Sequence, residues 1–242
     1  MRIAIITAMT EETLPILKKL GNVVAQDTIS GVLVRQIELE GNTIYLATSG
    51  IGEIRAALTV QLLRDLFDID VVLNFGFVGA LNNALDIAEL VIAERACHYQ
   101  FDLSAIDGTL VGQYDNRDDR YFYLDQTLID RVLSAIGISM KKVTVASGDK
   151  FIADKNDKTV LKNEFNCDIC DMEISGLALA CERNNIPLLS IKVVSDKADE
   201  SASASFLDVV KKGLSRYEQI LPTILKAISG TVKPLPPIKK QS

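Results

Sequence analysis

Short apolar runs rich in Val and Ile alternate along this chain with segments in which apolar residues recur every three to four positions. The first pattern is typical of buried strands and the second of amphipathic helices. Strands are expected at 2–7, 28–40, 42–47, 70–74, 88–96, 142–147 and 187–194. Helices are expected at 11–20, 52–67, 128–136, 159–165, 172–184 and 202–228.

This alternation predicts a single α/β domain over residues 1–229, with a central mixed β-sheet flanked by helices. Residues 100–125 follow neither period and are expected to form a long surface loop. Residues 230–242 are rich in Pro and Lys and are expected to form a loosely packed tail. Ligands of such sheets usually bind beyond the carboxyl ends of strands, so we looked for reactive side chains there.

The composition narrows the class of protein. The 242 residues are 48% hydrophobic, enough for a sizeable core, and the formal net charge of −6 argues against a nucleic-acid partner. No apolar stretch is long enough to span a membrane, so no membrane partner is expected. Four cysteines do not make a disulfide framework in a chain of this length. Reduced thiols and a cytoplasmic location are therefore expected.

Two glycine-containing segments follow expected strands, and each has an ordinary interpretation. "TSGIGEIRAA" (48–57) resembles part of a dinucleotide fingerprint, but Arg55 stands where that fingerprint requires Gly or Ala. "NFGFVGAL" (74–81) is consistent with a tight turn that packs its two phenylalanines. Each segment alone predicts either a turn or a small-ligand contact, and no cofactor is expected.

Three carboxylates lie where an expected strand gives way to a helix or loop: Glu12, Glu173 and Asp196. Each alone has an ordinary explanation, either as a solvated acid or as a complement to a helix dipole. Thr10 is suited to cap the helix that contains Glu12, whose first turn favours an ionised carboxylate. The cysteines and the single His98 show no metal-ligand spacing. Together the three carboxylates indicate acid/base chemistry on a neutral, polar organic substrate.

The order of six motifs resembles the nucleoside phosphorylase/nucleosidase superfamily from Met1 to about Ile228. Within it the chain is most similar to the 5′-methylthioadenosine/S-adenosylhomocysteine nucleosidases. The motifs are "IAIITAMTEE", "TSGIG", "NFGFVGAL", "SGDKFI", "DMEISGLALAC" and "VVSDKAD".

The resemblance implies a nucleoside phosphorylase-like fold, a small-molecule nucleoside substrate and a homodimer with the 100–125 loop near a partner's site. It implies that Glu12 activates water and that Asp196, helped by Ser195, protonates N7 of the leaving purine. Asp196 must then carry a proton, which burial would favour. Asp199 and Glu200 would add to this effect if they pointed inward, but solvated surface acids are the expectation for both. Substrate contacts are implied for Met9, Ile51, Gly76, Phe77, Phe151, Ile152, Met172, Glu173 and Ser195. Within that set, Phe151 stacks on the purine, the backbone of Ile152 reads its edge, and Met172 with Glu173 binds the ribose.

Departures from the family pattern leave alternatives open. Residues 75–79 replace the Thr-Gly-Ser-Ala-Gly segment of the nucleosidases, so that Phe77 stands where a hydroxyl is usual. In addition, Lys192 replaces an arginine and Ile106 replaces a phenylalanine. Phosphorylases of this superfamily bind phosphate with arginines, one of which immediately precedes this glycine turn. Here Asn74 and Phe75 precede it, which favours hydrolysis over phosphorolysis. A phosphorylase remains an alternative if Arg35 or Arg55 reaches the site. The other alternative is a nucleoside-binding protein with weak catalysis.

Overall fold

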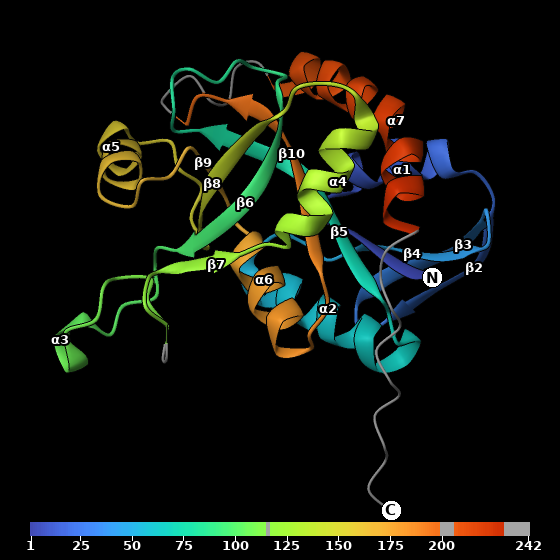
Figure 1. The fold of residues 1–242 in the computed structure, drawn as a ribbon, viewed down its shortest axis with the longest axis horizontal. Helices are drawn as coiled ribbons and strands as arrows, with labels where there is room; N and C mark the ends of the chain where they lie inside the picture. The colour runs from blue at the N-terminus through green and yellow to red at the C-terminus, as the bar shows by residue number, and fades with distance from the viewer. Residues whose placement is uncertain (115–116, 199–205, 230–242) are drawn as a thin grey trace, which may run out of the picture.

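The computed structural model describes residues 1–114, 117–198 and 206–229 (Figure 1). Its strands are β1 (Arg2–Thr7), β2 (Val23–Ile29), β3 (Val32–Leu39), β4 (Asn42–Thr48), β5 (Val71–Ala80), β6 (Leu90–His98), β7 (Tyr121–Tyr123), β8 (Lys141–Ser147), β9 (Ile169–Asp171) and β10 (Leu188–Asp196). Its helices are α1 (Thr10–Leu20), α2 (Glu53–Phe67), α3 (Ser104–Asp107), α4 (Gln126–Ile136), α5 (Lys155–Asn163), α6 (Ile174–Arg183) and α7 (Phe206–Ser229).

One mixed sheet joins the strands in the order β10-β6-β8-β9-β5-β1-β4-β3-β2, and β7 pairs with β6. Since β10 also pairs with β5, the five strands from β10 to β5 close on themselves. Strands β5 and β9 run in opposite directions and pair only through Gly79 with Cys170 and Ala80 with Ile169. The carboxyl end of β5 therefore pairs with the first two residues of β9, and this pairing lies beside the candidate site. The expected α/β domain with a central mixed sheet is confirmed.

Helices cover the sheet in two groups (Figure 1). Helix α7 packs against α1 and α4, whereas α2 packs against α6. The start of α6 approaches α2 closely, because a Cβ at Gly176 would lie 2.2 Å from the carbonyl oxygen of Glu53. Any larger residue at 176 would push α6 away from α2.

Several element boundaries differ from the predicted ones. The strand expected at 28–40 is wrong: β2 and β3 form a hairpin whose turn at Ser30–Gly31 has positive φ at both residues. The expected strand at 70–74 continues through both glycines to Ala80, because β9 and β10 pair with this stretch. Strand β9 was not predicted, since three residues are too short to show a period.

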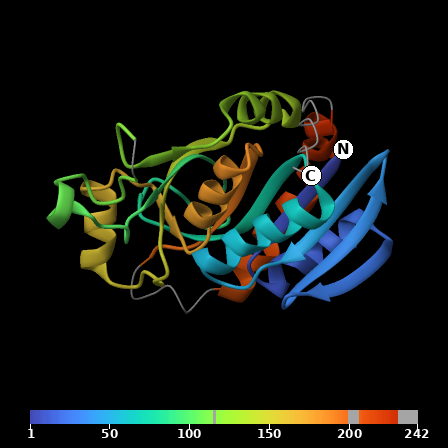
Figure 2. The same ribbon diagram turned by 90° about the horizontal axis from the view of Figure 1, so that it is seen from below.

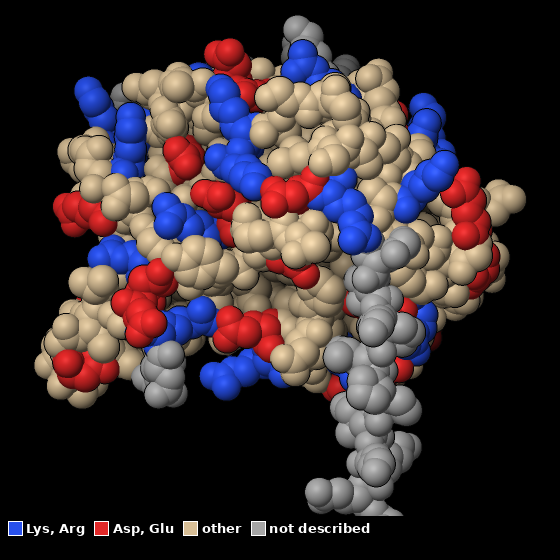
Figure 3. Space-filling model, in the orientation of Figure 1, with Lys and Arg blue, Asp and Glu red and all other residues tan. Residues whose placement is uncertain are grey.

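The loop expected at 100–125 contains α3 and β7, so it is not wholly irregular. The tail expected at 230–242 lies outside the described residues, as do Asp199 and Glu200. Among the described helices, none is both long and apolar enough to cross a membrane. In Figure 2 the β2–β3 hairpin lies at the end of the molecule opposite to α3 and α5. The face drawn in Figure 3 carries acidic and basic side chains side by side.

Candidate active site

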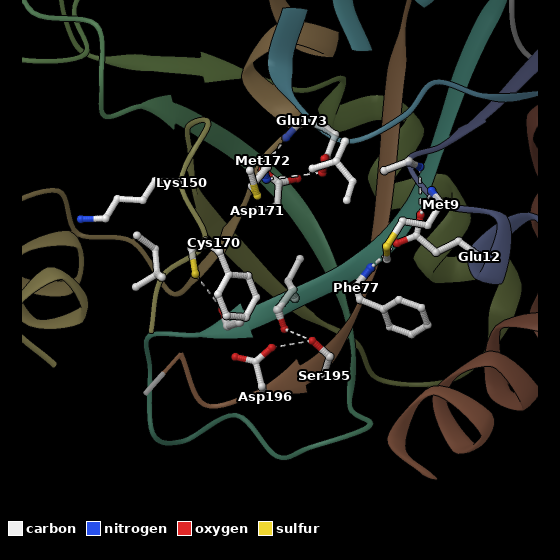
Figure 4. Close-up of a pocket in the computed structure, with 16 residues that line it drawn as sticks. Met9, Glu12, Phe77, Lys150, Cys170, Asp171, Met172, Glu173, Ser195 and Asp196 are labelled. Atoms are coloured by element: carbon white, nitrogen blue, oxygen red, sulfur yellow. Dashed lines mark hydrogen bonds between the residues drawn. The ribbon is translucent and has the colours of Figure 1, made fainter. Parts of the chain in front are cut away.

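A cavity of about 250 Å³ opens where β1, β5, β9 and β10 end (Figure 4). Its walls come from six segments that are far apart in the chain. The lining residues are Ala8, Met9, Glu12, Ile51, Phe77, Val78, Gly79, Lys150, Phe151, Ile152, Cys170, Asp171, Met172, Glu173, Ser195 and Asp196. In Figure 4, Met9 and Glu12 lie on one side of this cavity, and Cys170 and Asp196 lie on the other.

Glu12 is held by backbone donors from the residues that follow β1 and from within β5. Its Oε2 accepts the N–H groups of Ala8 at 2.9 Å and Met9 at 3.0 Å, and its Oε1 accepts the N–H of Phe77 at 3.0 Å. Burial raises the pKa of Glu12, whereas these three N–H groups and the ammonium of Lys192 oppose the rise. The carboxylate is thus fixed in orientation, as a general base needs to be.

The expected Thr10 cap is wrong, because α1 begins at Thr10 itself and Met9 is its N-cap residue. The side chain of Glu12 supplies the capping bond by reaching back to the N–H of Met9. The candidate base and the start of α1 therefore stabilise each other.

Asp196 ends β10 at an irregularity in the strand. The pairing of β10 with β5 shifts between Val194 and Asp196, and Ser195 is the additional residue. Such a bulge redirects the side chains around it. Asp196 Oδ2 lies 2.7 Å from Ser195 Oγ, and Oδ1 accepts the N–H of Ala198 at 2.8 Å. Ser195 Oγ also lies 3.2 Å from the carbonyl oxygen of Val78.

This arrangement suits Asp196 in either protonation state. A hydroxyl group has one donor and two acceptor positions. Ser195 donates to an ionised Asp196 or, alternatively, accepts from a protonated one while donating to Val78. Ser195 Oγ therefore remains hydrogen-bonded to Asp196 in both arrangements.

A second buried network lies beneath the wall that Asp171 and Glu173 form. Lys192 Nζ is 2.7 Å from Asp171 Oδ2, and both side chains are almost fully buried. Asp171 Oδ1 accepts the N–H groups of Glu173 at 3.4 Å and Ile174 at 3.3 Å, where α6 begins. Burial lowers the pKa of Lys192, but Asp171, Glu173 and Glu12 more than offset this effect and raise it. Lys192 is therefore a buried cation.

Glu173 faces the cavity from the N-terminal end of α6. Its Oε1 accepts the N–H of Gly52 at 3.1 Å, a contact that the close approach at Gly176 permits. Burial, followed by the charge of Asp171, raises the pKa of Glu173 to about 7, and Lys192 opposes the rise. Near neutral pH this carboxyl therefore exists in both protonation states.

The remaining walls are largely apolar. Phe151 is 63% exposed, while Ile152 is buried and Met172 is half-buried. Cys170 lies beside Asp196, since the Cβ of a side chain at Gly79 would be 3.0 Å from Cys170 Sγ and 3.1 Å from Asp196 Oδ1. An exposed aromatic ring beside buried apolar side chains is suited to hold a planar base.

The cavity brings together all but one of the residues expected to contact a substrate. Gly76 is the exception, because it lies under Glu12 and Lys192 and does not line the cavity. A Cβ at this position would be 3.1 Å from Glu12 Oε1 and 3.4 Å from Lys192 Nζ.

The sequence interpretation missed six lining residues: Ala8, Val78, Gly79, Lys150, Cys170 and Asp171. Asp171 precedes the predicted pair Met172 and Glu173, so its acidic side chain was the available signal. Among the described residues no cluster of His, Cys, Asp and Glu is arranged to hold a metal ion.

The fold and the cavity are accompanied by a match to a known protein family. The sequence model of the Phosphorylase superfamily matches residues 2–226. The chain belongs to this superfamily, as the order of its motifs predicted.

Individual relatives narrow the similarity further. The chain is 30% identical over 227 residues to a 5′-methylthioadenosine/S-adenosylhomocysteine nucleosidase of Buchnera aphidicola, covering 91% of this chain and 97% of that protein. It is 29% identical over 223 residues to an aminodeoxyfutalosine nucleosidase of Campylobacter jejuni, covering 87% and 92%. The structure of a futalosine hydrolase of Helicobacter pylori superimposes with a TM-score of 0.86 at 28% identity, covering 93% and 97%.

Proposed function

We propose that this protein hydrolyses the N-glycosidic bond of 5′-substituted adenosines, such as 5′-methylthioadenosine and S-adenosylhomocysteine, and releases adenine. The observation that carries the proposal is the pair of buried carboxylates on opposite sides of one cavity, Glu12 and Asp196. The relatives named as nucleosidases support it.

Asp196 acts as the general acid in this proposal. Cleavage leaves negative charge on the purine and oxocarbenium character on the ribose. Transfer of a proton from Asp196 to N7 neutralises the purine as it leaves, which lowers the barrier. Ser195, which is 2.7 Å from Asp196 Oδ2, keeps a hydrogen-bond partner for the carboxyl before and after the transfer.

Glu12 acts as the general base and removes a proton from the attacking water. The raised pKa of Glu12 makes it a stronger base than an exposed glutamate. The backbone N–H of Phe77 binds Glu12 at 3.0 Å, so replacement of a hydroxyl side chain by a phenyl ring leaves this contact in place. The buried ammonium of Lys192 interacts with both Glu12 and Glu173 and limits the repulsion between them.

Glu173 binds the ribose hydroxyl groups when it is ionised, and its negative charge also stabilises the developing positive charge on the sugar. The base then lies between Phe151, Ile152 and Asp196. This orientation directs the 5′ substituent toward Met9 and Ile51.

Water is favoured over phosphate as the nucleophile. The described cavity lining contains four carboxyl groups, one lysine and no arginine. It therefore lacks the guanidinium groups that hold a phosphate dianion with paired hydrogen bonds.

We also propose that the protein works as a homodimer. Helix α2 exposes Ile54, Leu58 and Leu66, which are 71%, 64% and 53% accessible. Their spacing of four and eight residues places them on one face of the helix. The family resemblance implies a homodimer, and in this proposal the apolar face of α2 contacts the second copy.

The proposed activity is tested with purified protein and 5′-methylthioadenosine, with and without phosphate. We expect adenine and free methylthioribose, at a rate indifferent to phosphate. In Glu12→Gln, kcat should fall by about 10²–10⁴-fold because the base is lost, with substrate binding retained in calorimetry.

Glu40→Gln is the control, since Glu40 lies in the exposed β3–β4 turn. Near-normal turnover by Glu12→Gln would contradict the mechanism. A strict need for phosphate, with a sugar 1-phosphate as product, would establish the phosphorylase instead.

A further inference from the structure

A larger groove adjoins the active-site cavity, called the cleft below, on the side of Met9. Its volume is about 940 Å³, and it shares Ala8, Met9 and Ile51 with the cleft. In the proposed orientation the purine lies at the opposite side, beside Asp196. The groove is therefore the space into which a long 5′ substituent extends.

The groove combines apolar walls with hydroxyl groups. Its floor is the face of β3 and β4 that carries Leu33 and Thr48, which pair across the two strands. Leu14 of α1 and Leu58 of α2 form walls and are 53% and 64% exposed. Such a groove suits a substituent with an apolar stem.

Two arginines line the same groove. Arg35 projects from β3, and its Nε donates to Gln26 Oε1 at 3.0 Å. Arg55, in the first turns of α2, folds back over the loop, because a Cβ at Gly50 would lie 3.0 Å from its Cδ and 3.1 Å from a guanidinium nitrogen. Gly50, with φ of +84°, therefore leaves space that keeps Arg55 along the groove.

Basic side chains outnumber acidic ones along the groove. Its described lining has two arginines and one acid, Glu11, whereas that of the active-site cavity has four carboxyl groups and one lysine. A carboxylate at the end of a 5′ substituent is attracted by the two arginines of the groove. Arginine also matches the geometry of a carboxylate with two parallel hydrogen bonds.

We infer that this groove binds the 5′ substituent and that Arg35 and Arg55 select adenosines whose 5′ substituent ends in a carboxylate. The inference rests on the proposed function and specifies its substrate class. It offers a physical basis for choosing among the 5′-substituted adenosines that the named relatives act on.

The test compares two substrates that differ only in charge: 5′-deoxy-5′-(3-carboxypropylthio)adenosine and its primary amide. We expect kcat/KM to favour the acid by about fivefold to tenfold, mainly through KM. Raising the salt concentration should weaken the preference. The double variant Arg35→Gln/Arg55→Gln should lose it, and Arg35→Lys/Arg55→Lys should keep part of it.

Arg131→Gln is the matched control, since Arg131 is exposed on α4 and lines neither hollow. The acid-to-amide ratio cancels any general loss of activity in a variant. An equal rate for acid and amide in the wild type would overturn the inference, as would a preference that survives loss of both arginines. Failure to release adenine from either compound or from 5′-methylthioadenosine would instead refute the proposed function.

Discussion

At the scale of single residues, the site depends on how four buried charges are balanced. Glu12, Asp171 and Glu173 surround Lys192, so one cation faces three carboxyl groups. Because burial makes an unpaired charge costly, it raises the pKa of both Glu12 and Glu173, that of Glu173 to about 7.

The ionisation of Glu173 should therefore appear in the pH dependence of kcat/KM. Below about pH 7 the carboxyl is protonated and accepts hydrogen bonds from the ribose less well, so the rate should fall there. Asp171→Asn removes a neighbouring negative charge, which should lower the pKa of Glu173 and shift this acidic limb to lower pH.

The measurement is a pH–rate profile of both proteins with 5′-methylthioadenosine. Asp171→Asn should also melt at lower temperature, since Lys192 loses its nearest partner. A purely structural role of Asp171 would lower the melting temperature and leave the acidic limb unmoved.

At the scale of elements, the junctions between strands and helices position the chemistry. The β10 bulge directs Asp196, and the start of α1 orients Glu12. The start of α6 carries Glu173 to the N–H of Gly52, which is possible only because α6 lies close to α2 at Gly176.

Gly176→Ala tests this junction. Alanine favours a helix by about 1 kcal/mol over glycine, but its Cβ would lie 2.2 Å from the carbonyl oxygen of Glu53. Overpacking of this kind costs about 1–3 kcal/mol. We expect a lower melting temperature and a higher KM, measured by calorimetry and steady-state kinetics. A melting temperature at or above that of the wild type would show that helix propensity outweighs the contact.

At the scale of the whole molecule, the exposed face of α2 lies beside the groove, since Leu58 belongs to both. Dimerisation through this face would bring a second copy to the outer side of the groove. Substrate choice and assembly would then depend on neighbouring parts of one helix.

Ile54→Glu tests the dimer, because Ile54 is 71% exposed on α2 and lines neither hollow. A buried glutamate pair would oppose association, so light scattering after gel filtration should give a monomer for the variant and a dimer for the wild type. Ile138→Glu, at an exposed position after α4, is the control. An Ile54→Glu dimer as stable as the wild type would exclude this face.

The sequence by itself determined the alternating elements, the single α/β domain and the three carboxylates at element boundaries. These features follow from local periods and from the order of motifs. Only the tertiary structure decided that β5 continues to Ala80, that β9 exists, that Asp171 pairs with Lys192 and that two arginines line a groove beside the cleft. The physical reason is that pairing of strands, burial of charge and the shape of a hollow depend on residues far apart in the chain, about which a local pattern carries no information.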